Sequence, residues 1–233
     1  GTTCHVDFCM QQPGDTPKQS LERWFQKLEE GPPLIDVGFH FAVTDLSDPG
    51  SLAELRDHPE VRAVIWRGEG RSFSSGRDVG SIGTLRVEMS HHELMRRGHR
   101  GIQQVWDLDA PVIVACKGWV MGGSFQRALL CDIRVASEGA RFRLPEVGHG
   151  VIPDTGGMAV LYEMCGHGLV SDMVLTGRRL SAEEALAHGI VSRIVSPDAL
   201  DDTAREMADR IAASPAVAVK LARKVIGHLA RPP

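Results

Sequence analysis

Residues 111–137 have the sequence PVIVACKGWVMGGSFQRALLCDIRVAS, which divides into four segments of different character. The first, residues 112–116, is apolar at every position, and an uninterrupted apolar run of this length is typical of a parallel strand buried on both faces. A glycine-rich turn over 118–123 follows, and then a helix is expected over 124–130 and a second strand over 132–136. Strand, turn, helix and strand in this order predict a parallel α/β unit.

The same alternation continues on both sides of this unit. Residues 61–66, VRAVIW, form another apolar run of a buried strand, and a further strand is expected within 34–44. Apolar residues at helical spacing predict helices over 18–30, 51–56, 88–107, 158–164, 168–176, 181–188, 198–213 and 215–229, with a short strand over 190–195. The predicted fold class is therefore α/β, with crossover helices between parallel strands and a helical C-terminal region.

The composition excludes several classes of function. A net charge of −4 and an aromatic content of 5% provide neither a basic surface nor a stacking platform for nucleic acid. No apolar run approaches the roughly 20 residues of a membrane span, and no signal-peptide pattern is present. The five cysteines lack disulfide or metal-ligand spacing. We therefore expect a cytoplasmic protein with reduced thiols, no metal, and no nucleic-acid or membrane partner.

Two glycine-rich loops follow the buried strands. Residues 71–78, RSFSSGRD, come after the strand at 61–66, and residues 118–123, GWVMGG, come after the strand at 112–116. Ligands of α/β folds lie at such strand ends, and the second loop opens a helix, whose free N–H groups favour negative charge. Two converging amides of this kind can hold the oxygen of an enolate or a tetrahedral intermediate. The spacing alone also fits tight strand–helix turns without a ligand.

Residues 111–157 closely resemble the crotonase, or enoyl-CoA hydratase/isomerase, superfamily. Residues 70–79 match its upstream oxyanion loop, and residues 175–195, LTGRRLSAEEALAHGIVSRIV, match its downstream helix–turn–strand. The resemblance runs from about Val61 to Lys224 and implies a crotonase-like fold of stacked ββα units with a helical C-terminal region. It also implies three segments: a divergent, partly disordered N-terminal segment 1–33, a crotonase core 34–197, and C-terminal helices 198–233 that are truncated relative to the family.

The resemblance implies an enzyme that acts on acyl-CoA thioesters, with coenzyme A carried as part of the substrate and no separate cofactor. In the family, two backbone amides bind the thioester oxygen and stabilise an enolate, and by position these amides belong to Ser74 and Gly123. The residues implied to contact the substrate or its CoA moiety are Phe73, Ser75, Gly76, Arg77, Asp78 and Gly122.

Three side chains are candidates for the catalytic chemistry. Family hydratases use two glutamates to deliver water; the second is present here as Glu146, but Gln126 stands at the position of the first. A neutral amide cannot accept a proton, so ordinary hydratase turnover with two carboxylates is in doubt, and Gln126 is expected to orient water or a substrate carbonyl. Asp154 is a second candidate carboxylate, or alternatively the N-cap of the helix over 158–164.

The function that these features imply is that of an enoyl-CoA hydratase or isomerase in which two amides stabilise the enolate and Glu146 is the acid/base. Two alternatives remain open. One is a non-catalytic acyl-CoA binder, which the missing first glutamate suggests. The other is a malonyl-CoA-type decarboxylase or C–C bond-forming enzyme of the carboxymethylproline synthase kind, which the sequence resembles at 125–126 and 145–150. A homotrimer or homohexamer is the family expectation.

Overall fold

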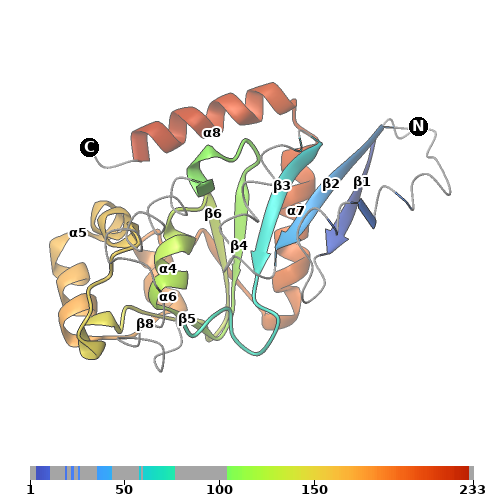
Figure 1. The fold of residues 1–233 in the computed structure, drawn as a ribbon. Coiled ribbons are helices and arrows are strands. Elements are labelled where there is room, and N and C mark those ends of the chain that lie inside the picture. The colour runs from blue at the N-terminus through green and yellow to red at the C-terminus, as the bar shows by residue number, and fades with distance from the viewer. Residues whose placement is uncertain are drawn as a thin grey trace, which may run out of the picture.

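The computed structural model describes residues 4–10, 36–43, 60–76 and 104–230, together with the isolated positions 19, 22, 23, 26 and 58. Within this part of the chain, the main sheet has six strands in the order β1-β2-β3-β4-β6-β9 (Figure 1). Each strand runs parallel to its neighbours, as predicted for an α/β fold. The strands are Cys4–Met10, Asp36–Val43, Val61–Arg67, Val112–Cys116, Ile133–Ser137 and Arg193–Val195.

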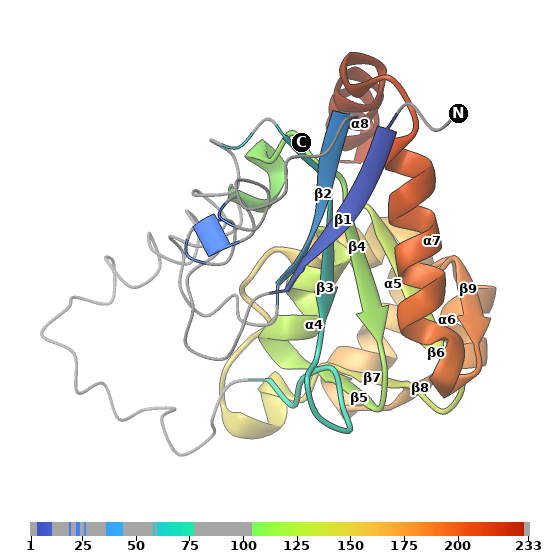
Figure 2. The ribbon, with the colours of Figure 1, turned by 90° about the vertical axis from the view of Figure 1, so that its right-hand side faces the viewer.

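The central strands β3 and β4 are buried because helices cover both faces of the sheet. On one face, Ile65 and Ile113 belong to a hydrophobic cluster with Ala204 of α7 (Leu200–Ala212). On the other face, Val114 belongs to a cluster with Phe125 of α4 (Gly122–Leu129). Figure 2 shows α7 and α4 on opposite sides of the sheet. A strand with apolar packing on both sides has no polar face, which explains why β4 is apolar at every position.

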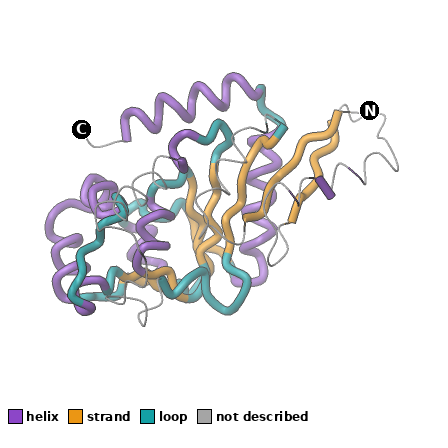
Figure 3. The backbone as a smooth tube through the Cα atoms, viewed as in Figure 1, coloured by secondary structure: helices purple, strands orange, loops and turns teal. Residues whose placement is uncertain are grey.

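A second, three-stranded sheet lies beside the main one (Figure 3). Its strands are β5 (Trp119–Met121), β7 (Arg141–Arg143) and β8 (Leu180–Ser181); β5 pairs with β7 in parallel, and β7 with β8 antiparallel. None of these strands was predicted from the sequence. Segments of two or three residues are too short to show a period of alternation, and only their pairing with distant segments defines them.

The helices of the C-terminal half agree closely with the predicted ranges. α5 (Gly157–Thr176) breaks at Gly166, where φ is 74° and ψ is 173°, so it consists of two arms that correspond to two predicted helices. α6 (Ala182–Ala187) begins with a capping box between Ser181 and Glu184, and α8 (Ala216–Ala230) closes the described chain. The short 3₁₀ turns are η2 (Glu146–His149) and η3 (Pro197–Ala199).

The N-terminal part departs from the prediction at β1. Residues 4–10 lie in the segment 1–33 that was expected to be partly disordered, but they form a strand whose seven residues pair with β2. The segment CHVDFCM alternates between apolar and polar residues over its first five positions, and this period of two is typical of a strand. The predicted helices over 18–30 and 51–56 lie almost entirely outside the described residues, and of the predicted helix 88–107 only residues 104–107 are described, as helical.

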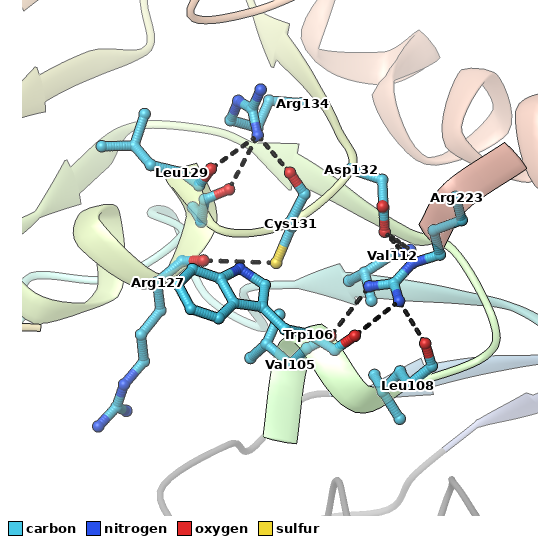
Figure 4. Close-up of polar contacts among 11 residues, drawn as sticks. Val105, Trp106, Leu108, Val112, Arg127, Leu129, Cys131, Asp132, Arg134 and Arg223 are labelled. Carbon is cyan, nitrogen blue, oxygen red and sulfur yellow. Dashed lines mark hydrogen bonds and ion pairs between the residues drawn. The ribbon is translucent and has the colours of Figure 1, made fainter. Parts of the chain in front are cut away.

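Two arginines bind backbone carbonyls at the ends of helices (Figure 4). Arg134 on β6 is buried and donates to the carbonyl oxygens of Ala128, Leu129, Cys131 and Ile190. Arg223 on α8 donates to the carboxylate of Asp132 and to the carbonyl oxygens of Val105, Trp106 and Leu108. The last carbonyls of a helix have no partner inside it, and a cation there also interacts favourably with the helix dipole. Arg134 thereby fixes the C-terminal end of α4.

Replacing Arg134 by methionine removes its hydrogen bonds to the carbonyls of Leu129, Cys131 and Ile190, whereas the carbonyl of Ala128 still accepts from the N–H of Cys131. We expect Arg134→Met to lower the free energy of unfolding by at least about 3 kcal/mol, because each buried polar group left unpaired costs about 1–3 kcal/mol. The midpoint of urea unfolding, followed by circular dichroism, measures the loss. Arg193→Met on the exposed edge of β9 is the matched control, with an expected change below about 0.5 kcal/mol. Equal midpoints for the two variants would contradict the capping role of Arg134.

Candidate active site

The first glycine-rich loop is attached to the second by a β-bridge. Ser74 pairs in parallel with Val120 of β5. The Ser74 N–H donates to the carbonyl of Trp119 at 2.9 Å, and the Ser74 carbonyl accepts from the N–H of Met121 at 3.1 Å. The two loops, which are separated by more than forty residues in the sequence, therefore lie side by side.

Next to this bridge, the backbones of both loops approach the carboxyl group of Glu146. A β-carbon placed on Gly122 would lie 3.7 Å from the Cα of Gly76 and 3.6 Å from Oε1 of Glu146. Both glycines have positive φ, 88° for Gly76 and 59° for Gly122, a conformation that other residues rarely adopt. The junction of Gly76, Gly122 and Glu146 is the candidate active site.

The bridge changes the role predicted for Ser74. Because its N–H already donates to Trp119, this amide is not free to bind a thioester oxygen in this structure, contrary to the expectation. The Ser74 hydroxyl instead donates to Oγ of Ser124 at 2.8 Å and accepts from the N–H of Gly76 at 3.2 Å. Ser74 therefore fixes the loop. Successive N–H groups of an extended chain point in opposite directions, so pairing decides which amide faces the site, and sequence spacing does not show it.

The Gly123 amide lies in the first turn of α4, at the positive end of the helix dipole. The N-cap residue Met121 makes no side-chain hydrogen bond to this turn, whose N–H groups have no acceptor within the helix. No heavy atom lies within 4 Å of the position that a β-carbon on Gly123 would occupy. An anionic oxygen can therefore approach this helix end closely.

The side-chain amide of Gln126 joins three parts of the site. Gln126 is only 1% exposed; its Nε2 donates to Oε1 of Glu146 at 2.8 Å, and its Oε1 accepts from the backbone N–H of Thr155 at 3.0 Å. A buried amide is stable only when its donor and acceptor are both satisfied. In the described structure Gln126 therefore positions Glu146 and the loop before α5. Its expected role in orienting water or a substrate carbonyl stays a prediction.

Glu146 combines partial burial with an unsatisfied carboxylate oxygen. Its Oε2 is buried and has no hydrogen-bond partner among the described residues. Burial raises the pKa of Glu146 above its ordinary value of 4.5, and the nearby charge of Asp154 raises it further. Hydrogen bonds from its own backbone N–H and from Gln126, together with the charge of His149, act in the opposite direction. Desolvation of the charged form is the largest of these effects, and it suits the carboxylate to accept a proton.

The other predicted site residues differ in their surroundings. Asp154 is exposed, and it is not the N-cap of α5, because Gly156 occupies that position. Phe73 was expected to contact substrate, but it is buried in the core, where its ring packs against Trp66 with 4.9 Å between centroids. Ser75 is exposed on the first loop. Arg77 and Asp78 lie outside the described residues.

Two positions of the site were not predicted. Thr155 contributes the backbone N–H that Gln126 accepts, and its own Oγ1 is buried without a hydrogen-bond partner among the described residues. Gly157 packs so closely on Gln126 that a β-carbon at Gly157 would overlap the Gln126 backbone. The sequence signal was the pair of glycines at 156–157 directly before a helical pattern, which indicates a close approach of two backbones.

Two further searches of the described ranges gave no additional site. No three His, Cys, Asp or Glu side chains gather there in a way that could hold a metal ion. None of the described helices combines the length and apolar character that a membrane crossing requires.

Comparison with known proteins agrees with the fold. The family model for enoyl-CoA hydratase/isomerase matches residues 42–232. A carnitinyl-CoA dehydratase from Salmonella paratyphi A is 38% identical over 192 residues, which cover 82% of this chain and 71% of that protein. The chain belongs to the enoyl-CoA hydratase/isomerase family and has its crotonase fold.

Solved structures of related proteins have the same fold. An enoyl-CoA hydratase from Bacillus anthracis superimposes with a TM-score of 0.68 at 31% identity, covering 79% of this chain and 73% of that one. A probable enoyl-CoA hydratase/isomerase from Mycobacterium abscessus gives a TM-score of 0.70 at 31% identity, with 78% and 70% covered.

The contact between Gln126 and Glu146 predicts a pH-dependent change of stability. Gln126→Glu places a second carboxyl group beside Glu146, and two carboxylates so close together cannot both ionise easily. The pair will retain a proton to a higher pH in the folded state than in the unfolded state. Stability will therefore be retained at low pH and lost as pH rises through the raised pKa of the pair. The urea midpoint of Gln126→Glu should therefore fall increasingly below that of the wild type as the pH is raised from about 4 to about 9.

The matched control exchanges the two groups. The double variant Gln126→Glu/Glu146→Gln again contains one carboxyl and one amide, so the additional pH dependence should disappear. If the single variant follows the wild type across the whole pH range, the two side chains are not in contact in solution.

Proposed function

We propose that this chain catalyses proton transfer on acyl-CoA thioesters, in the hydration–dehydration or double-bond isomerisation of enoyl-CoA substrates. Glu146 carries the proposal, because it is a carboxyl group with a raised pKa, held beside two glycine-rich loops. Such a group is matched to proton transfer nearer neutral pH than a solvated carboxylate. The family, and relatives named as carnitinyl-CoA dehydratase and enoyl-CoA hydratase, support acyl-CoA as the substrate.

The thioester oxygen is proposed to bind between the two loops. The backbone N–H of Gly123, at the start of α4, is proposed to donate one hydrogen bond to this oxygen. A backbone N–H of the first loop, after the bridge at Ser74, is proposed to donate the second. Gly76 and Gly122 allow the two loop backbones to approach each other beside Glu146, because neither has a side chain, and the acyl group is proposed to lie next to this junction. Arg77 and Asp78 continue the first loop and are proposed to contact the CoA moiety. Coenzyme A is then part of the substrate, and no separate cofactor is required.

A single carboxylate can complete the dehydration of a 3-hydroxyacyl thioester. Glu146 takes the proton from C2, and the electron pair of that C–H bond moves into the thioester to form an enolate, whose oxygen the amides stabilise. The enolate then forms the C2–C3 double bond as the C3–O bond breaks. The departing hydroxyl receives the proton from Glu146 and leaves as water, which returns Glu146 to its starting state. A 3-enoyl thioester follows a different course. Removal of its C2 proton by Glu146 gives an enolate conjugated with the C3–C4 double bond, and return of the proton to C4 moves the double bond to C2–C3.

Gln126 and Asp154 are proposed to act through Glu146. Gln126 keeps one carboxylate oxygen in place by hydrogen bonding, which leaves Oε2 for the substrate proton. Asp154 raises the pKa of Glu146 by its charge. Alternatively, Asp154 itself transfers a proton to the substrate. Turnover of the Asp154→Asn variant, described below, distinguishes this role from an effect on the pKa of Glu146.

The chain is also proposed to form a homotrimer or homohexamer. α8 is held against the body of the protein by polar contacts, in which Arg223 binds Asp132 and Lys220 binds Asp109. Its outward side is a stripe of apolar side chains, each more than half exposed: Val217, Leu221, Val225, Ile226 and Leu229. An apolar patch of this kind is typical of a surface that another chain covers.

Turnover is expected to depend strongly on Glu146. Glu146→Gln should reduce turnover of a panel of 3-hydroxyacyl- and enoyl-CoA esters by about 100-fold or more, because it removes the acid/base group. Exchange of the C2 proton for deuterium in D₂O, followed by mass spectrometry, measures the first step separately. Wild-type turnover should also fall as pH decreases through the raised pKa of Glu146, because the base must be ionised.

Asp154→Asn is the control for this experiment. If Asp154 acts only by its charge, this variant keeps turnover near the wild-type level and its acidic limb moves to lower pH. A loss as large as that of Glu146→Gln would instead make Asp154 a catalytic group. Binding of acyl-CoA without turnover or exchange by the wild type would favour the non-catalytic binder. Release of CO₂ from malonyl-CoA would favour the decarboxylase.

The assembly is tested by light scattering. We expect the wild type to have the mass of three or six chains, and Leu221→Glu to shift it toward the monomer by placing a charge in the apolar stripe. Leu186→Glu is the matched control, because Leu186 is an exposed apolar side chain on α6, outside that stripe. A monomeric wild type would contradict the proposed assembly.

A further inference from the structure

Thr155 carries a buried hydroxyl group that no described residue satisfies. In the described parts of the chain, four buried side-chain atoms lack a hydrogen-bond partner: Nε of Arg67, Oε1 of Gln104, Oε2 of Glu146 and Oγ1 of Thr155. Buried polar groups of native proteins normally have partners, so each exception needs an explanation. Two of the four, on Glu146 and Thr155, belong to the candidate active site.

These two residues bind opposite ends of one side-chain amide. Oε1 of Glu146 accepts from Nε2 of Gln126 at 2.8 Å, and the backbone N–H of Thr155 donates to Oε1 of Gln126 at 3.0 Å. Each residue therefore uses one polar group on Gln126 and keeps a second, Oε2 or Oγ1, without a protein partner. Asp154, directly before Thr155 in the chain, lies close enough to Glu146 for its charge to raise the pKa of that carboxyl group. The unpaired carboxylate oxygen and the unpaired hydroxyl thus belong to neighbouring parts of one site.

Helix capping does not explain the hydroxyl of Thr155. The N-cap of α5 is Gly156, and no side-chain hydrogen bond caps this helix end. The position of Thr155 is fixed by its backbone, which donates to Gln126, and by Gly157, which packs on the backbone of Gln126. A valine has nearly the same shape without the unpaired oxygen, whose burial costs free energy. The hydroxyl is therefore not required to hold the fold at this point, and a ligand is the partner that remains.

We propose that Oγ1 of Thr155 binds the oxygen atom that leaves C3 of the substrate in dehydration or adds to C3 in hydration. This inference rests on the proposed function. Oγ1 accepts a hydrogen bond from the hydroxyl proton of the substrate, which turns a lone pair of the substrate oxygen toward Glu146. In dehydration that lone pair receives the proton from Glu146 as the C3–O bond breaks. In hydration Thr155 holds one proton of the water while Glu146 takes the other and then returns it to C2.

The contact favours hydration and dehydration over isomerisation. Both reactions begin with transfer of the C2 proton to Glu146, but only dehydration involves an oxygen at C3. Thr155 is neutral and transfers no proton, so Glu146 remains the acid/base and Thr155 orients the oxygen on which it acts. Loss of the hydroxyl therefore affects only steps that involve the C3 oxygen, whereas a general distortion of the site slows every step.

Binding of unreactive esters tests the contact without turnover. 2,2-Difluoro-3-hydroxybutyryl-CoA and 2,2-difluorobutyryl-CoA have no C2 proton, so neither can undergo elimination. Isothermal titration should show the hydroxylated ester binding about three- to ten-fold more tightly, which is the contribution of one neutral hydrogen bond. Thr155→Val should abolish this preference, and Thr155→Ser should keep it. Thr203→Val, on α7 at the opposite side of the sheet from α4, is the matched control.

Turnover and stability separate this role from a structural one. Thr155→Val should reduce kcat for dehydration of 3-hydroxybutyryl-CoA by about ten-fold or more. The same variant should change C2 deuterium exchange of butyryl-CoA, which has no oxygen at C3, by less than about two-fold. Its urea midpoint should equal or exceed that of the wild type, because an unpaired buried oxygen is removed. An equal loss in both reactions, or a lowered midpoint, would assign the hydroxyl a structural role and overturn the inference.

The binding experiment also distinguishes failure of this inference from failure of the proposed function. If the wild type binds both esters without preference, the inference is overturned even where turnover depends on Glu146. If a preference that depends on Thr155 is present without turnover or C2 exchange, the contact is supported and the proposed catalysis is not. Failure to bind either ester overturns both.

Discussion

The buried amide of Gln126 is the interaction on which the candidate site depends. Its nitrogen must donate and its oxygen must accept, and the fold provides one partner for each: the carboxylate of Glu146 and the backbone N–H of Thr155. These partners fix η2 and the start of α5 relative to α4. A carboxylate at position 126 would repel Glu146, and an apolar side chain would leave both partners unsatisfied. Gln126, which stands where family hydratases have their first glutamate, thus fixes the position of the Glu146 carboxylate.

The chemistry of the site follows from how closely the backbones approach one another. Gly76 and Gly122 bring two loops together beside Glu146, and Gly157 brings α5 onto Gln126 without an intervening side chain. This packing removes water from Glu146, and desolvation is the main cause of its raised pKa. Close packing and acid/base tuning are therefore consequences of the same glycine positions. At the other end of α4, the carbonyls bound by Arg134 hold the helix that carries Gln126.

The elements that were predicted correctly are those whose local pattern is long enough to be recognised. β3, β4, α4 and both arms of α5 fall close to the predicted ranges because each contains a sustained apolar run or a helical period. β5, β7 and β8 were missed because strands of two or three residues show no period. Phe73 was assigned to substrate because of its place in a motif, although its ring packs against Trp66 in the core.

The sequence by itself determined the parallel α/β class and the two glycine-rich loops, because residue type and local spacing are sufficient for these. Glu146 as the principal carboxylate is what the resemblance to the family implies, and its catalytic role stays a prediction. Only the tertiary structure decided how the loops are used. The bridge to β5 occupies the Ser74 amide, and the buried Gln126 donates to Glu146. A hydrogen-bonding direction and a degree of burial depend on residues that are distant in the chain, so no local pattern contains them.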